Sequence, residues 1–284
     1  MIDIFALTIL IFIGLGILSS LMGLYVRRYE DTNLVTSIYV TFILIAQVLA
    51  TKLSVFNFGT LEIGNITILD TILFVAPTGV LVFPFTFQLT DIVNEKFGRK
   101  ETQRMIGIAF ITQILMVFFF ILASNLDGFI ASSNSADALN VWNSLFSFTL
   151  SITLGSWAAY LISENLDAYV YQFFKKLTGG RKHLWFRNIG SDIIGLIVDS
   201  LVFVPLAFFI IPSLLGNSVL PDQVIIDTFF GQIATKLFFG ILDTPFLYLS
   251  RWLMYGELDK YFPFLERFAP PEVQSSNEIA SKTQ

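Results

Sequence analysis

Residues 83–100, with the sequence FPFTFQLTDIVNEKFGRK, determine how the rest of the chain is interpreted. The stretch begins in a run apolar enough for a bilayer, passes Pro84, and ends after Gly98 in a basic cluster. Asp91 and Glu95 are four residues apart, so on a helix their side chains share one face. One interpretation is a short surface helix with Asp91 in its first turn, where an acid suits the helix dipole, and with Gly98 ending it in the left-handed conformation. The other is that two acids facing the same way beside a membrane span have a function.

Composition indicates an integral membrane protein. Of the 284 residues, 55% are hydrophobic and only 14% are charged, whereas soluble domains carry about 25% charged residues. The chain has no cysteine, and its single histidine, His183, lies in a basic loop, so thiolate and histidine-based metal or catalytic sites are excluded. A net charge of −5 is not the basic footprint of a nucleic-acid-binding protein. We therefore expect no metal, no cofactor and no nucleic-acid partner.

Seven apolar runs are long enough to cross a bilayer core, which takes about 20 residues. We expect helices, because a span in lipid must satisfy its own backbone hydrogen bonds and because the runs lack the alternation of barrel strands. The sequence thus predicts an all-α, polytopic transmembrane bundle of about seven spans, a six-helix core plus an N-terminal helix. The runs occupy residues 4–26, 34–56, 69–89, 104–125, 145–174, 190–212 and 228–253.

Nearly all of the 17 Lys and Arg residues lie in the first, third and fifth connections and in the C-terminal region. By the positive-inside rule we expect the N-terminus outside and the C-terminus in the cytoplasm, in a multi-pass protein of the inner cell membrane. We divide the chain into an extra N-terminal helix with its loop (1–33), a core (34–255) and a cytoplasmic tail (256–284). The tail is rich in Pro, Ser and Glu, which predicts partial disorder.

Charged residues inside or near the predicted spans are the strongest functional signal. Each costs roughly 2.5–3.5 kcal/mol at a helix centre, so their number argues against chance. Buried ion pairs or headgroup contacts are the structural alternative, which we favour for Asp167 and Asp192 near helix ends. We favour function for Lys52, Asp199 and Lys236, because Asp199 lies close to the predicted midplane.

Helical spacing arranges these residues in stripes that would line a cavity if they faced a common centre. Acids outnumber bases there, and burial disfavours the charged form, so one or more carboxyls are expected to bind protons as the cavity faces each side. The prolines at 77, 84 and 245 mark gates, ligand contacts or static kinks. The stripes are Gln232, Lys236, Gly240 and Asp243; Asp192, Gly195 and Asp199; and Ser156, Tyr160, Glu164 and Asp167.

Three segments resemble the queuosine precursor transporter family. Residues 83–100 are similar to its signature, with a proline–aromatic pair, a T-D dipeptide, an N-E dipeptide and an aromatic-Gly-basic close. Residues 50–52 (ATK) resemble that family's lysine-bearing helix, and residues 187–191 (RNIGS), followed by Asp199, Ser200 and Phe203, resemble its later loop and helix. The resemblance covers roughly residues 34–255. It implies a transporter core and a membrane carrier of 7-deazaguanine bases used in tRNA modification.

The resemblance implies import of queuosine or archaeosine precursors, 7-cyano-7-deazaguanine, 7-aminomethyl-7-deazaguanine or both, by a secondary carrier without enzyme activity. No phosphate-cradling motif is present to drive transport by ATP itself. Two alternatives stay open: a substrate-binding subunit that needs a separate ATPase module, and a structural or enzymatic membrane protein. The expected partners are the base and the lipid bilayer, with a homodimer left open. The binding or coupling candidates are Asp199, Lys236, Gln232, Lys52, Asp91, Glu95, Glu164, Asp243 and Asn188.

Overall fold

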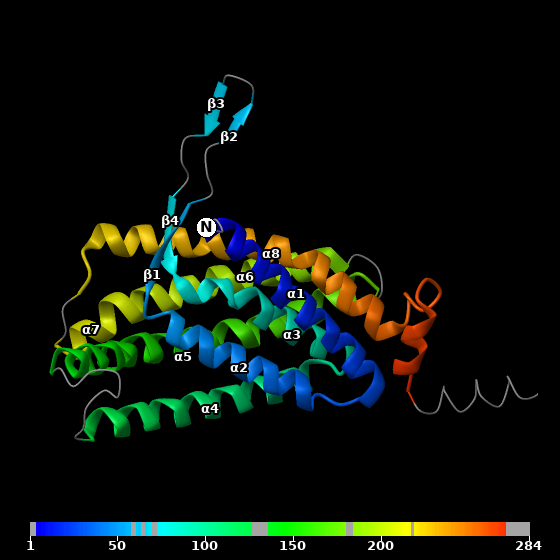
Figure 1. Ribbon diagram of the computed structural model, residues 1–284, viewed down its shortest axis with the longest axis horizontal. Coiled ribbons are helices and arrows are strands. Elements are labelled where there is room, and N and C mark those ends of the chain that lie inside the picture. The colour runs from blue at the N-terminus through cyan, green and yellow to red at the C-terminus, as the bar shows by residue number, and fades with distance from the viewer. Residues whose placement is uncertain are drawn as a thin grey trace, which may run out of the picture.

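The computed structural model is a bundle of helices, and it describes residues 4–57, 61–63, 66–69, 73–126, 136–179, 184–216 and 219–270. The strands form two antiparallel pairs, β1 with β4 and β2 with β3. Short helical turns cover Thr78–Leu81, Leu206–Ile210 and Pro263–Phe268. In chain order (Figure 1) the main elements are α1 (Ile4–Tyr29), α2 (Asn33–Leu49), β1 (Leu53–Asn57), β2 (Leu61–Ile63), β3 (Ile66–Leu69), β4 (Leu73–Pro77), α3 (Phe83–Lys96), α4 (Arg99–Asn125), α5 (Ala136–Leu177), α6 (Leu184–Pro205), α7 (Ile211–Leu214) and α8 (Asp222–Tyr255).

Four segments of the described chain are long and apolar enough to cross a membrane: Thr8–Tyr29, Arg99–Asn125, Trp185–Leu214 and Asp222–Tyr255. α2 is apolar but has only 17 residues, and α5 has 42. The predicted helical membrane bundle is therefore supported, whereas the count of seven spans is not established. His183, the loop residues 127–135 and residues 271–284 of the predicted tail lie outside the described residues.

The predicted third span, residues 69–89, is wrong. Residues Leu73–Pro77 form β4, a helical turn covers Thr78–Leu81, and α3 begins only at Phe83. The aromatic and β-branched residues of β4 suit a strand and find a partner in β1. Pro84 lies in the first turn of α3, where its missing N–H removes no helical hydrogen bond, so it begins the helix and does not interrupt it.

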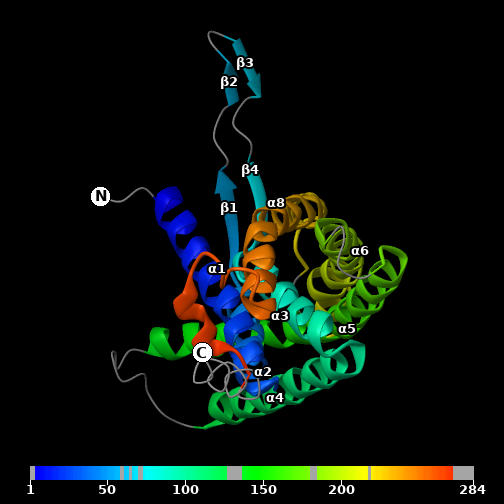
Figure 2. The ribbon, with the colours of Figure 1, turned by 90° about the vertical axis from the view of Figure 1, so that its right-hand side faces the viewer.

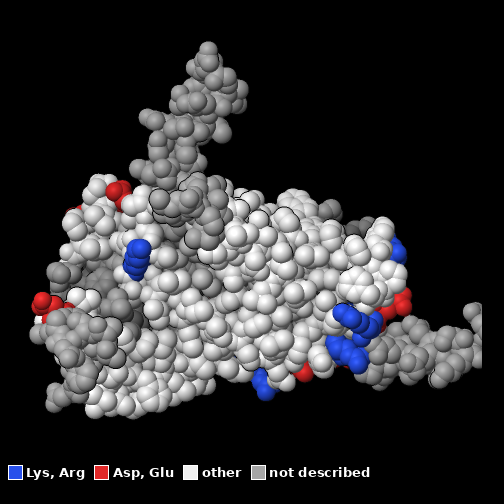
Figure 3. All heavy atoms as spheres, in the orientation of Figure 1, with Lys and Arg blue, Asp and Glu red and all other residues white. Residues whose placement is uncertain are grey.

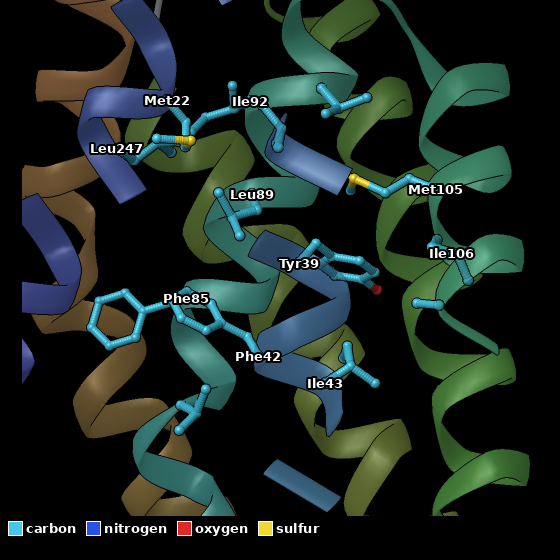
Figure 4. Packing of buried hydrophobic residues seen from close by; sticks show 14 of the residues in the cluster. Met22, Tyr39, Phe42, Ile43, Phe85, Leu89, Ile92, Met105, Ile106 and Leu247 are labelled. Atoms are coloured by element: carbon cyan, nitrogen blue, oxygen red, sulfur yellow. The ribbon is translucent and has the colours of Figure 1, made fainter. Parts of the chain in front are cut away.

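α3 is the central helix of the bundle. It contacts α1, α2, α4, α5 and α8, and in the view along the bundle it lies among them (Figure 2). Every residue from Pro84 to Glu95 is buried. Figure 4 shows Phe85, Leu89 and Ile92 of α3 packed against apolar side chains of its neighbours. The surface-helix interpretation of Asp91 and Glu95 is therefore wrong, because both acids lie inside the bundle and Asp91 is far from the first turn.

The predicted second span also ends early. α2 stops at Leu49, and Lys52 lies in the bend that leads to β1, where its side chain is exposed. Its backbone carbonyl accepts a hydrogen bond from the Thr78 N–H at 2.8 Å, which ties the bend to the start of the turn before α3. Lys52 is therefore neither embedded in a helix nor in need of a buried partner.

Basic residues gather at one end of the bundle, which we call the basic end. Arg27 and Arg28 close α1, Lys96 closes α3, and Lys175 lies in the last turn of α5. Most of the Lys and Arg side chains visible in Figure 3 lie at this end, on the right, and the long sides of the bundle are almost free of charge. This distribution agrees with a bundle whose axis crosses a membrane.

α1 packs closely on α8 through small residues. A Cβ added to Gly23 would lie 2.3 Å from the Ser250 carbonyl oxygen. The Ser20 hydroxyl adds a hydrogen bond across the same contact, to the Phe246 carbonyl oxygen at 2.9 Å. Small residues and interhelical hydrogen bonds are the usual means of holding helices together in lipid, because the lipid chains are as apolar as the helices.

We expect Gly23→Ala to lower the melting temperature of the detergent-purified protein, because overpacking typically costs about 1–3 kcal/mol. Gly14→Ala is the matched control on the same helix, since a Cβ there would meet nothing within 4 Å. Thermal unfolding of both variants beside the wild type measures the effect. Equal melting temperatures for the two variants would refute the close α1–α8 contact.

Candidate functional site

A cavity of about 50 Å³ lies inside the bundle, where α2, α4, α5, α6 and α8 meet the start of α3. One part of its wall is aromatic, formed by Phe83, Tyr160 and Phe203. Small and aliphatic residues such as Ile43 and Ala46 also line it, and its polar side chains are Gln47, Gln113, Ser156, Asp199, Gln232 and Lys236. A cavity with apolar walls and a few converging polar groups is the usual form of a small-molecule site.

An ion pair between Asp199 of α6 and Lys236 of α8 dominates the polar wall. Both side chains are buried. The Gln232 amide donates to the same carboxylate oxygen, Oδ2, at 3.2 Å, and the Ser163 hydroxyl donates to Oδ1 at 3.4 Å. The Lys236 ammonium also lies 3.8 Å from the centre of the Phe83 ring. Asp199 is close to the middle of the Trp185–Leu214 segment, as the sequence predicts.

Two glutamines also line the cavity, and neither was predicted. Gln47 lies on α2 and Gln113 on α4. Among the described residues, the amide nitrogen of Gln47 and the amide oxygen of Gln232 have no hydrogen-bond partner, although both side chains are buried. The cavity therefore offers a free donor and a free acceptor beside a carboxylate. A single polar residue inside an apolar run was the only sequence signal for Gln47.

Buried carboxyls continue from the cavity toward the basic end. We call Asp91 of α3, Asp167 of α5, Asp192 of α6 and Asp243 of α8 the carboxyl cluster; all four are at most 5% exposed. Asp91 lies within electrostatic range of the other three. Glu164, one turn before Asp167 on α5, lies within range of Asp167, Asp199 and Lys236, so it links the cluster to the cavity. Ion pairs do not account for Asp167 and Asp192, because neither residue forms a salt bridge in the part of the chain that the structure describes. Both side chains are also buried in the bundle, which argues against headgroup contacts.

A second ionic group lies beyond the cluster. The Glu95 node consists of Glu95 with Lys175, Arg187, Arg251 and Tyr171. Lys175 Nζ is 3.1 Å from Glu95 Oε2, and Arg187 Nη2 is 3.4 Å from Oε1. The Tyr171 hydroxyl donates to Oε2 at 3.2 Å, and Arg251 Nε lies 3.9 Å from Oε1. The node therefore joins α3, α5, α6 and α8 at one point.

The structure sorts the predicted candidates into these groups. Asp199, Gln232 and Lys236 meet at the cavity, and Glu164 lies beside them. Asp91 and Asp243 belong to the carboxyl cluster, and Asn188 donates to Asp192 at 3.0 Å. Glu95 belongs to the node, whose contacts are those of a structural tie. Lys52 lies outside all three groups.

We expect Glu95→Gln to destabilise the protein strongly, because it removes the carboxylate that faces the fully buried Arg187. Breaking one partner of a buried ion pair typically costs about 3–5 kcal/mol. Glu101→Gln is the control, since Glu101 pairs with the exposed Arg104 at 3.5 Å and such surface pairs contribute about 0–1 kcal/mol. Unfolding in detergent followed by circular dichroism compares the two, and equal losses would show that the node is not a structural tie.

Comparison with known proteins finds matches that cover most residues of this site. The sequence model of a family described as "Putative vitamin uptake transporter" matches residues 77–250. A "Probable queuosine precursor transporter" of Bacillus subtilis is 28% identical over 171 residues, which cover 60% of this chain and 69% of that protein. Another protein with that description, from Haemophilus influenzae, is 25% identical over 131 residues, 46% of this chain and 51% of that protein. No solved structure matches. The family match includes Asp199, Lys236 and the whole carboxyl cluster, whereas Gln47 precedes it.

Proposed function

The chain belongs to this vitamin uptake transporter family, and from that premise we propose that it imports the 7-deazaguanine precursors of queuosine, acting as a secondary carrier. The observation that carries the proposal is the cavity around the buried Asp199–Lys236 pair. A charged pair in the middle of a membrane bundle is expensive to maintain, and such residues commonly mark a substrate or ion pathway. Carrier sites commonly lie at that depth, where a change of shape exposes them to either side.

The groups around the cavity match the chemistry of a 7-deazaguanine base. Such a base is flat, so it stacks on an aromatic ring such as Phe83 or Tyr160. Its guanidine-like N–H edge suits the two acceptor oxygens of Asp199. Its ring carbonyl suits a donor, and the Gln47 amide nitrogen is free to supply one. Buried polar groups without partners are costly, so a ligand that satisfies them gains affinity and specificity.

The cavity is narrow. Ligand pockets usually measure about 300–1,000 Å³, so at about 50 Å³ the cavity has to widen before it can hold the base. The turn before α3 and the end of α2 form one wall, and a Cβ added to Gly79 would lie 2.6 Å from the Ala46 carbonyl oxygen. Separation of these two segments would open the cavity on the side away from the basic end.

We extend the proposal to seven membrane-crossing helices, α1 to α6 and α8 with the bounds given above, and to a basic end in the cytoplasm. The support is the gathering of Arg27, Arg28, Lys96 and Lys175 at one end of the bundle together with the positive-inside rule. A reporter fused at Ser133 is expected to react with an impermeant reagent from outside, and one fused at Lys182 only after the cells are permeabilised. Reaction at Lys182 in intact cells would refute this orientation.

We expect Asp199→Asn to abolish uptake of the labelled base in cells that cannot make it, with the wild-type chain expressed alone restoring uptake. The substitution keeps the size of the side chain but places an NH2 donor against the donor edge of the base. A hydrogen bond to a charged group is worth about 1.5–3 kcal/mol, or roughly ten- to a hundredfold in affinity. Competition between the cyano and aminomethyl bases in the same assay identifies the preferred substrate.

Two further variants separate recognition from folding. Asp137→Asn removes an exposed acid in the first turn of α5, away from the cavity, and is expected to transport like the wild type. Asp199→Asn combined with Lys236→Met removes both charges, so it avoids leaving Lys236 without a counterion. If the double variant regains uptake, Asp199 serves only to neutralise Lys236, and the proposed ligand contact is wrong. If the wild-type chain transports only when an ATPase subunit is present, the secondary-carrier assignment fails.

A further inference from the structure

The carboxyl cluster lies between the cavity and the Glu95 node, and transport of a base without a charge, such as 7-cyano-7-deazaguanine, does not by itself require it. On α6, Asp192 comes seven residues before Asp199, and on α8, Asp243 comes seven residues after Lys236. At 1.5 Å per residue each separation is about 10 Å along the bundle axis. Arg187 and Arg251 then lie further along the same helices. Asp91 of α3 interacts electrostatically with Asp192 and Asp243 and with Asp167 of α5, so four helices each contribute one carboxyl to the cluster.

Charge in this interior is unbalanced. Lys236 pairs with Asp199, and the three bases of the node surround Glu95. Seven carboxyls on α3, α5, α6 and α8 thus face four bases, so not every acid here can be ionised and compensated. The acids are Asp91, Glu95, Glu164, Asp167, Asp192, Asp199 and Asp243, the bases are Lys175, Arg187, Lys236 and Arg251, and the tyrosines that face them are Tyr39, Tyr160 and Tyr171.

The hydrogen bonds of the cluster also show a shortage of donors. Neither carboxyl oxygen of Asp91 or of Asp243 has a hydrogen-bond partner within the described chain. Asn188, which is fully buried, is aimed at the cluster, because its amide nitrogen donates to Asp192 at 3.0 Å. Its amide oxygen has no donor among the residues that the structure covers. The site thus gathers acceptors that lack donors, and a proton on a carboxyl supplies a donor and removes a negative charge at once.

A metal ion is a poorer occupant than a proton. In the described part of the chain, no group of three or more His, Cys, Asp or Glu side chains is placed to hold a metal ion. Hard cations require several oxygen ligands at about 2.0–2.6 Å around one point. Protons impose no such geometry, because each binds to one oxygen and can pass to the next acceptor in line.

A small void and one further carboxyl, Glu164, lie between the cluster and the cavity. A small void of about 10 Å³ is lined by Phe83, Phe87, Asp192, Lys236 and Gly240, among others. That volume is close to the minimum for one water molecule, and Asp192 and Lys236 provide polar partners for it. Glu164 gives a second connection, since it lies within electrostatic range of both Asp167 and Asp199.

We propose that the carboxyl cluster is a proton-binding site that couples uptake of the base to entry of protons; the coupling rests on the proposed transport function. The donor edge of the base competes with Lys236 for Asp199, which changes the charge next to Glu164 and the void. A proton taken up through the cavity then resides on the cluster and leaves toward the Glu95 node when the basic end opens. The proton is neither consumed nor produced, and the base crosses unchanged.

Reconstitution into liposomes tests the coupling. Wild-type protein is expected to accumulate labelled 7-cyano-7-deazaguanine when the outside is made more acidic, by up to tenfold for about one pH unit and one proton per base. A protonophore abolishes accumulation but leaves exchange of internal for external base, which needs no gradient. In Asp192→Asn and Asp243→Asn, the ratio of gradient-driven accumulation to exchange falls to the value measured without a gradient.

Asp227→Asn is the matched control, because Asp227 is an exposed acid on the same helix as Asp243. It should keep the wild-type ratio. Accumulation driven by a sodium gradient and not by protons would overturn the proposal, as would a wild-type ratio in both cluster variants. Exchange of base by the wild type without any response to pH would overturn the coupling while leaving the transport function intact.

A second measurement needs no substrate, so it tests proton binding even if the liposomes show no exchange of base. Infrared spectroscopy of the purified protein at neutral pH is expected to show the C=O stretching band of protonated carboxyls. That band should weaken in Asp192→Asn and Asp243→Asn and persist in Asp227→Asn. Its absence from the wild type would overturn proton binding by the cluster, whatever the protein transports.

Discussion

A charge buried between helices has to be compensated by something other than bulk water, and this constraint orders the interior of the bundle. Three levels result, each with a different solution. At the cavity, one acid meets one base, Asp199 with Lys236. At the basic end, one acid meets three bases in the Glu95 node. Between them lies the carboxyl cluster, which has no basic residue of its own. There, on the proposal above, a bound proton compensates the negative charge.

α3 holds these levels in register. It begins at the cavity with Phe83, carries Asp91 at the level of the cluster, and ends at the node with Glu95. Its apolar residues pack on α1, α2 and α4, and Asn94 donates to the Ala168 carbonyl oxygen of α5 at 3.1 Å. α6 and α8 each contribute residues to all three levels, so they connect the Asp199–Lys236 pair with the cluster and with the node.

The parts of this arrangement that the sequence predicted are those that depend on helical period alone. Gln232, Lys236 and Asp243 share a face because one helix turns every 3.6 residues, and the same holds for Asp192 and Asp199. The third span was predicted wrongly because β4 depends on pairing with β1, a contact between segments on either side of a hairpin that periodicity does not encode. Lys52 was misplaced for the same reason, since the end of α2 is set by that pairing. Gln47 and Gln113 were missed because one amide in an apolar run forms no stripe.

The structure around the cavity differs between its two ends, and this difference bears on how a carrier could alternate. Toward the basic end the helices are tied by ionic contacts with Glu95. On the other side the helices are interrupted by irregular backbone, namely β4, the turn at Thr78–Leu81 and the π-helical turn at Leu206–Ile210. Irregular backbone at membrane depth is tolerated only where protein or a cavity surrounds it, and π-turns are frequent at functional sites.

Opening the side with irregular backbone would rearrange the backbone and close contacts such as that of Gly231 with the Val75 carbonyl oxygen. Opening the basic end, in contrast, would have to separate ion pairs.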